Sequence, residues 1–317
     1  MPKRIPLYGC GIRVTLANQE ELSVSKPDVH PYEIELETAV TVAAAAASVV
    51  RDLYDRVAAE TYTKSDGSPV TDADLAADRM IRERLSERFP DDAILSEESA
   101  DDPRRLTAPR CWIVDPLDGT AQFVARTGDF DVLIALVVGG RPVVAVGCQP
   151  TTGLLCGAVS GRGAWTATSV EADRTPLQFL PPARPPRITT SIWFGAPLNA
   201  SLMGNVADRL GAAPPPVAET GFSPRIFLPV DGRRQLDAML GIHPRHDKAQ
   251  EMGREWDFVV ADLIINEAGG VVTDLTDQLH AYNKPSTRNR GGLLAAVDRK
   301  THRQVLQAVA DVRKSSN

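Results

Sequence analysis

The run Asp115-Pro116-Leu117-Asp118-Gly119-Thr120 directly follows the apolar segment 111–114. Its two carboxylates stand three positions apart at a predicted strand end, beside a stiffening proline, so both face one small volume. Oxygen ligands of this kind suit Mg²⁺. The glycine allows close backbone approach, and the threonine offers a hydroxyl and an N–H at a predicted helix start, where anions bind. The alternative is a solvated aspartate turn, which the complete hexad disfavours.

Three further acidic groups strengthen this interpretation. Glu97 and Glu98 end a short strand-like run, Asp74 opens one predicted helix, and Asp257 opens another. Each has a simpler explanation: Asp74 as a helix cap, the two glutamates as solvated side chains, and Asp257 as a partner of the helix dipole. Taken together, carboxylates at the ends of several elements predict a multi-metal oxygen cage, of the kind that serves phosphoryl transfer.

The elements that must position these residues change character along the chain. Apolar periodicity predicts a helix over 32–60 and a second helix that ends before Pro90, with Thr71 and Asp74 spaced as a capping box. Short strands follow, including a hairpin turned at Gly139-Gly140. This antiparallel meander after helices indicates an α+β first half.

The Pro-rich segment 175–187 is the best linker candidate. Strands and helices alternate more evenly after it, with helices expected near 201–210, 256–268 and 300–312. We therefore expect an N-terminal extension over 1–30, an antiparallel-sheet, metal-binding α+β subdomain over 31–185, and a substrate-side α/β subdomain over 186–317.

Composition excludes several classes of protein. The 317 residues are 43% hydrophobic and 24% charged, as in a globular protein with a core. A net charge of −6 argues against binding a nucleic-acid polymer. No apolar stretch suits a signal peptide or a membrane span, and the four cysteines have no CxxC spacing, so we expect a cytoplasmic protein without membrane partners.

Four motifs in the same order resemble the inositol monophosphatase superfamily over residues 35–310. They are the hexad 115–120, the run Leu-Ser-Glu-Glu at 95–98, Ser-Pro-Val-Thr-Asp-Ala-Asp at 68–74, and Trp-Asp at 256–257 with Glu-Ala-Gly-Gly at 267–270. The resemblance implies a layered αβαβα sugar-phosphatase fold. It also implies an Mg²⁺-dependent, Li⁺-sensitive phosphatase that acts on a small phosphorylated substrate, and it is compatible with a homodimer.

The resemblance also implies roles for individual residues. One of two or three Mg²⁺ ions would be held by Glu97, Asp115 and the Leu117 carbonyl, and a second by Asp115, Asp118 and Asp257. Asp74 and Thr120 would be catalytic by polarising the attacking water. The Gly119 and Thr120 amides would hold the phosphate, and the site would be supported by Lys64 and Glu98.

Secondary motifs favour one branch of the superfamily. The run Arg126-Thr-Gly-Asp-Phe130 resembles the bacterial 3′(2′),5′-bisphosphate nucleotidases, which remove the 3′-phosphate of 3′-phosphoadenosine 5′-phosphate. The substrate side departs from that pattern at Ala121-Gln122, at 221–225 and at 259–261. Ser223, Arg225 and Arg245 are the candidate substrate contacts, with Arg225 in place of a family lysine.

Two alternatives stay open because the departures lie on the substrate side. One is a monophosphatase for inositol or another sugar or nucleoside phosphate. The other is a non-catalytic sensor that binds a phosphorylated ligand. Elsewhere, the pair His243 and His246 suggests a zinc site only weakly, and Arg104-Arg105 is expected to be solvated.

Overall fold

The computed structural model describes residues 31–56, 59–64, 67, 69–191, 200–214, 217–218, 222–227, 236–242 and 251–315. The chain divides into two compact units, Met1–Pro31 and Tyr32–Asn317. The expected extension over 1–30 lies outside the described residues. Among the described helices of the second unit, none combines the length and the hydropathy that a membrane span requires.

The larger sheet of this unit has seven strands that follow chain order. They are β3 (Ala93–Ser96), β4 (Arg110–Asp118), β5 (Asp131–Val138), β6 (Arg141–Cys148), β7 (Leu155–Val159), β8 (Ala164–Ala167) and β9 (Thr175–Leu177). β3 and β4 are parallel, and every later pair is antiparallel. The predicted hairpin is confirmed, because β5 and β6 are joined by Gly139-Gly140, both with positive φ.

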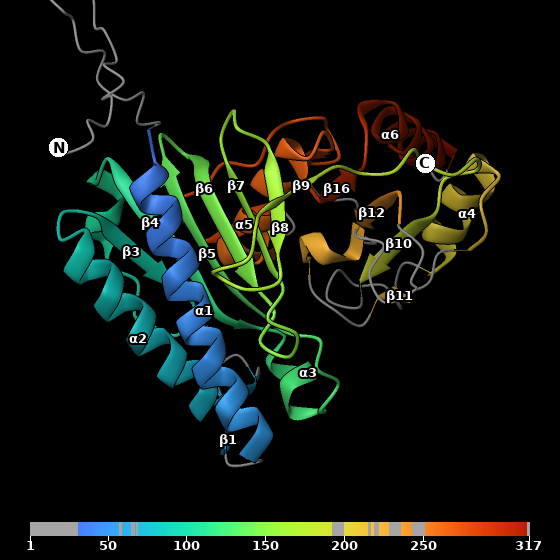
Figure 1. The fold of residues 1–317 in the computed structure, drawn as a ribbon. Coiled ribbons are helices and arrows are strands. Elements are labelled where there is room, and N and C mark those ends of the chain that lie inside the picture. Colours follow the sequence, from blue (N-terminus) through green and yellow to red (C-terminus); the bar gives the residue numbers. More distant parts are fainter. Residues whose placement is uncertain are drawn as a thin grey trace, which may run out of the picture. The chain divides into compact units, whose positions relative to one another are not determined.

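Helices cover both faces of this sheet (Figure 1). α1 (Glu33–Arg56) and α2 (Asp72–Arg88) pack on one face, against Val132, Ile134 and Leu136 of β5. α5 (Glu255–Glu267) packs on the other face, against the intervening residues Leu133, Ala135 and Val137. A sheet buried on both faces explains why β5 is an uninterrupted apolar run rather than an alternating one.

The smaller sheet has five strands in the order β11 (Val217–Ala218), β10 (Ile188–Ser191), β12 (Ala238–Gly241), β16 (Leu293–Ala296) and β14 (Val271–Thr273). Met239 and Ala295 on one face join the core around α5. Ala238, Leu240 and Leu294 on the other face pack with α4 (Ala200–Leu210) and α6 (Arg299–Ser315). The expected layered αβαβα fold is therefore confirmed, with α5 between the sheets.

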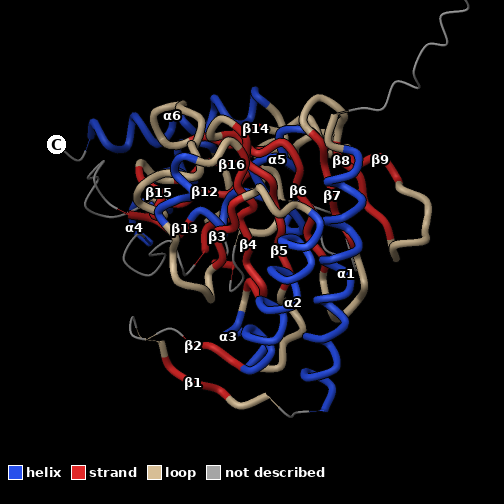
Figure 2. The backbone as a smooth tube through the Cα atoms, turned by 90° about the vertical axis from the view of Figure 1, so that its left-hand side faces the viewer, coloured by secondary structure: helices blue, strands red, loops and turns tan. Residues whose placement is uncertain are grey.

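Short elements complete the described part of the fold. They are β1 (Thr61–Thr63), β2 (Pro69–Thr71), the 3₁₀ turns η1 (Pro103–Thr107) and η4 (Pro224–Phe227), α3 (Thr120–Val124), β13 (Glu251–Arg254) and β15 (Arg288–Arg290). β1 pairs with β2, and β2 lies beside α3 (Figure 2). The predicted linker begins as a strand, because residues 175–177 form β9 and only the remainder joins the two sheets. The subdomain boundary at 185/186 stays a prediction.

Candidate active site

The acidic loop, which we define as residues 115–120, begins where β4 loses its regular pairing with β5. Asp115 pairs with Leu133, but the register shifts before Asp118, which pairs with Asp131. Inside this irregular stretch the Leu117 amide donates a hydrogen bond of 3.1 Å to the Asp115 carboxylate. The bulge therefore brings Asp115 and Asp118 close together at the end of one buried strand.

Gly119 makes the transition from this loop into α3. Its φ is +97°, a left-handed conformation that favours glycine. A Cβ atom here would lie 3.1 Å from the Asp129 carbonyl oxygen and 3.2 Å from the Phe130 Cβ. The close approach fixes the start of α3, and with it the position of Thr120.

Asp74 and Thr120 come together from different elements, as predicted. One carboxylate oxygen of Asp74 accepts from the amide and the hydroxyl of Thr71, at 2.8 and 2.6 Å. The other oxygen accepts from the Thr120 hydroxyl at 2.8 Å. Asp74 is therefore both part of the predicted capping box of α2 and a partner of Thr120, and its catalytic role stays a prediction.

Glu97 and Glu98 follow β3 directly. The Glu97 amide donates to the Val114 carbonyl oxygen at 3.2 Å, which extends the parallel β3–β4 pairing and places Glu97 beside Asp115. The Lys64 ammonium group donates to both glutamates, at 2.7 Å to Glu97 and 2.6 Å to Glu98. The two glutamates are therefore not simply solvated, and the expected supporting role of Lys64 and Glu98 stays a prediction.

Asp257 enters the site from the first turn of α5. It accepts a hydrogen bond of 2.6 Å from the amide of Arg254, which ends the preceding strand. Gly253 makes this possible: its φ is +61°, and a Cβ there would lie 2.8 Å from the Asp257 carboxylate. The turn before α5 therefore holds Asp257 in place through the backbone.

Burial and mutual repulsion dominate the electrostatics of these carboxyl groups. Burial raises the pKa of Asp115 well above its usual range, with further increases from Glu97, Asp118 and Asp257. Burial and then the charge of Asp257 raise the pKa of Asp118 in the same way. Burial, with Glu97, raises the pKa of Asp257 to about 7.

The two outer carboxyl groups are shifted in the same direction. Burial raises the pKa of Glu98 to about 7, although its hydrogen bond with Lys64 lowers it. Burial also raises the pKa of Asp74, against the hydrogen bonds from Thr71 and Thr120. Negative charge is therefore costly throughout the site.

The donor chemistry of the site fits divalent cations. Glu97, Asp115, Asp118 and Asp257 are buried or partly buried carboxylates that repel one another, and oxygen-rich, anionic groups are what Mg²⁺ requires. In the part of the chain that the structure describes, no three His, Cys, Asp or Glu side chains are arranged to hold a metal ion as they stand. The metal assignments therefore stay predictions.

The substrate-side candidates are only partly described. Arg225 lies in η4, where its guanidinium donates to Asp131 at 2.8–3.0 Å and to Asp129 at 3.2 Å. Ser223 is buried, and its hydroxyl accepts from the Arg225 amide at 3.3 Å. Arg245, with the His243 and His246 pair, lies outside the described residues. Contact of any of these with substrate stays a prediction.

One expectation about arginines is wrong. Arg105 is only 1% exposed, because its guanidinium donates to Asp101, to Asn283 and to the Lys284 carbonyl oxygen. The partners in the segment 283–284 are almost 180 positions away in sequence, so adjacent residues alone gave no sign of them. Its neighbour Arg104 is exposed, as expected.

Sequence reasoning missed two residues that shape the site. Gly253 makes room for Asp257, and Asp131 lies opposite Asp118 while it accepts hydrogen bonds from Arg225. Asp131 did leave a signal, since it is a charged residue at the very start of a long apolar strand. Gly253 acts through backbone geometry, which no residue spacing reveals.

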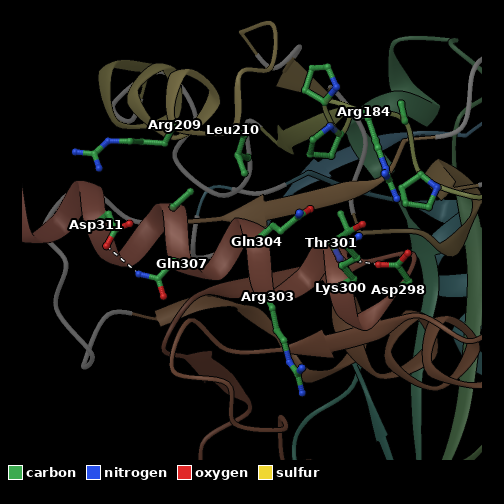
Figure 3. Close-up of a pocket in the computed structure, with 15 residues that line it drawn as sticks. Arg184, Arg209, Leu210, Asp298, Lys300, Thr301, Arg303, Gln304, Gln307 and Asp311 are labelled. Atoms are coloured by element: carbon green, nitrogen blue, oxygen red, sulfur yellow. Dashed lines mark hydrogen bonds between the residues drawn. The ribbon is translucent and has the colours of Figure 1, made fainter.

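A separate pocket of about 760 Å³ lies between the segment 182–186, the end of α4 and residues 300–311 of α6 (Figure 3). Seven of its 15 lining residues are exposed. None of the predicted catalytic, metal-binding or phosphate-binding residues lines it. The predicted chemistry therefore lies elsewhere, at the acidic loop.

Comparison with known proteins finds a matching family model and similar relatives. The model of the inositol monophosphatase family matches residues 33–314. The 3′(2′),5′-bisphosphate nucleotidase CysQ of Aggregatibacter actinomycetemcomitans is 30% identical over 252 residues, which cover 78% of this chain and 87% of that protein. The Nus factor SuhB of Salmonella typhimurium is also 30% identical, over 257 residues that cover 78% and 86%.

A solved structure shares the architecture. CysQ from Bacteroides thetaiotaomicron, a bacterial member of the inositol monophosphatase family, superposes with a TM-score of 0.66 at 26% identity. The superposition covers 85% of this chain and 99% of that structure. With a family match over most of its length and the family's layered fold, the chain belongs to the inositol monophosphatase family.

Proposed function

We propose that this protein is an Mg²⁺-dependent phosphomonoesterase. Members of its family are metal-dependent phosphatases. The observation that supports the proposal best is the 2.8 Å hydrogen bond from the Thr120 hydroxyl to Asp74, at the edge of the acidic loop. A site that only bound a phosphorylated ligand would not need this pair, whereas hydrolysis needs a group that orients water.

In this proposal each residue has one task. Glu97, Asp115, Asp118, Asp257 and the Leu117 carbonyl hold the cations, which when bound neutralise the phosphate and activate a water. Thr120 donates its hydroxyl hydrogen to Asp74, so its oxygen lone pairs are left to accept a hydrogen bond from the attacking water. The amides of Gly119 and Thr120 hold the phosphate at the start of α3.

For the substrate we propose the 3′-phosphate of 3′-phosphoadenosine 5′-phosphate or a related nucleotide. The run Arg126–Phe130 supports this choice, as does the similarity to a protein named as a bisphosphate nucleotidase. An inositol or sugar monophosphatase is the second candidate, because the family as a whole carries that name and the substrate-side residues depart from the nucleotidase pattern.

Phosphate release by the purified protein in Mg²⁺ tests both the proposed phosphatase activity and the proposed substrate. The panel is 3′-phosphoadenosine 5′-phosphate, inositol 1-phosphate and fructose 1,6-bisphosphate, each with and without Li⁺. We expect kcat/KM for the first to exceed the others at least tenfold, and Li⁺ to inhibit. A preference for inositol 1-phosphate would contradict the proposed nucleotide substrate, but it would still support the proposed phosphatase activity.

The variant Asp115→Asn tests the chemistry itself. It removes one of the carboxylates that would hold the cations, so we expect turnover to fall by at least about a thousandfold while circular dichroism stays unchanged. Unaltered turnover would contradict the mechanism. Tight nucleotide binding by the wild-type chain in calorimetry, without any phosphate release, would instead favour the non-catalytic sensor.

A further inference from the structure

A fifth carboxylate stands beside the proposed metal-binding set. Asp131 is the first residue of β5 and pairs directly with Asp118 across the strands. Residues that pair directly in an antiparallel ladder project to the same side, and like charges in such positions repel. The Asp131 side chain is only 4% exposed. It therefore places a further buried carboxylate next to Asp118.

Arg225 neutralises this group. Its Nε and Nη2 atoms donate to the two oxygens of Asp131 over 2.8–3.0 Å, and Nη1 donates to Asp129 at 3.2 Å. The paired, side-on geometry is the strong form of an arginine–carboxylate contact. Because that edge of the guanidinium is occupied by Asp131, Arg225 is already committed to a protein carboxylate rather than open to a ligand.

The backbone around Arg225 is held independently of this ion pair. Phe222 and Phe227, on either side, are fully buried. The Phe222 ring packs edge-on against Phe258, the residue after Asp257, with 5.6 Å between ring centroids. η4 is therefore fixed to α5 by aromatic packing, so changing the charge of Arg225 leaves the anchors of its segment in place.

We propose that Arg225 is a positioning residue, which balances Asp131 and so keeps this carboxylate out of the set that holds the cations. The inference rests on the proposed function, because it presumes that the acidic loop binds Mg²⁺. It differs from a role in gripping substrate phosphate, which would require the guanidinium to leave Asp131 bare in a buried position.

Calorimetric titration with Mg²⁺, without substrate, tests the proposal through a cycle of charge changes. In Arg225→Met the freed Asp131 joins the cation site, so we expect the Kd for Mg²⁺ to fall about tenfold. In Asp131→Asn the partly freed Arg225 repels the cation, so the Kd rises about tenfold. The double variant Arg225→Met with Asp131→Asn restores the Kd to within threefold of wild type.

Arg187→Met is the matched control. Arg187 also makes a side-on pair with a buried carboxylate, Asp237, at 3.1 Å for both contacts, but away from the acidic loop. We expect it to lower the unfolding temperature and leave the Kd for Mg²⁺ unchanged. A purely structural role for Arg225 would give the same result as this control, and would overturn the proposal.

The remaining outcomes are equally decisive. Titration with inorganic phosphate in saturating Mg²⁺ should give the same affinity for Asp131→Asn and the double variant. If the double variant loses affinity for phosphate and Asp131→Asn does not, Arg225 is a phosphate ligand and the proposal is overturned. This comparison holds even if Arg225→Met alone does not fold. A wild-type chain that binds no Mg²⁺ overturns the proposed function as well. If the wild type binds Mg²⁺ but the Kd for Mg²⁺ is the same in all the Arg225 and Asp131 variants, only the role of Arg225 is overturned.

Discussion

At the scale of single residues, Asp74 shows how one side chain serves structure and chemistry together. One of its oxygens closes the N-terminus of α2 with Thr71, and the other receives the Thr120 hydroxyl. A carboxylate has two oxygens with separate lone pairs, so the cap and the proposed catalytic contact do not compete. The rigid cap instead fixes the oxygen that faces Thr120.

This arrangement predicts that Asp74 and Thr120 act as a unit. Asp74→Asn and Thr120→Ala should each lower kcat by about a hundredfold or more, with little change in the affinity for Mg²⁺. The double variant should lose little beyond either single one, since each change breaks the same hydrogen bond. Steady-state kinetics measure this, with Thr120→Ser, which keeps the hydroxyl, as the control. Additive losses would contradict the pairing.

At the scale of elements, the start of α5 is held by the segment 283–284, which follows it in the chain. Glu255 is fully buried, and its carboxylate accepts from the amides of Asn283 and Lys284, at 2.6 and 3.0 Å. The Lys284 ammonium group adds a contact of 2.8 Å to the same carboxylate. Because Asp257 lies two residues further on, this clamp sets the position from which α5 presents it.

Breaking the clamp should therefore affect both stability and the site. Lys284→Met leaves Glu255 buried without its cation, so we expect a loss of about 3 kcal/mol in the free energy of unfolding and weaker Mg²⁺ binding. Arg299→Met is the control, because its pair with Asp277 is about half exposed on both sides and should contribute about 0.5 kcal/mol. Denaturant unfolding compares the two. Equal losses would argue against the clamp.

At the scale of the whole molecule, carboxyl groups from separate layers come together around the acidic loop. Glu97 and Asp118 come from the end of the large sheet, and Asp257 comes from the helix between the sheets. Without a cation these layers meet at groups that repel one another, as the raised pKa values of Asp118 and Asp257 indicate. Cation binding should therefore stabilise the fold as a whole.

Thermal unfolding with and without Mg²⁺ checks this expectation. At a Mg²⁺ concentration of about 100 times Kd, binding to the folded chain alone should add about 2.7 kcal/mol and raise the Tm measurably over the protein in chelator. Asp257→Asn should abolish most of that rise. Asp277→Asn, which changes a half-exposed carboxylate, should keep it. If Mg²⁺ leaves the Tm of the wild type unchanged, the proposed cation site is contradicted.

Local patterns predicted much of the fold and of the site. The spacing of Thr71 and Asp74 predicts the cap that is observed, and the Gly139-Gly140 pair predicts the hairpin. The helices expected near 201–210, 256–268 and 300–312 are present as α4, α5 and α6, with ends that differ by at most three residues. These features depend on neighbours a few positions apart, so the local sequence contains the information they need.

Contacts between distant segments could not be predicted in this way. Arg105 is buried rather than solvated because residues 283–284 receive it, and Arg225 is engaged by Asp131 and Asp129, 94 and 96 positions away. The sequence by itself determined the acidic residues, their local turns and the helix and strand types. Only the tertiary structure decided which charges meet, because the energy of an ion pair depends on distance and burial, and folding sets both.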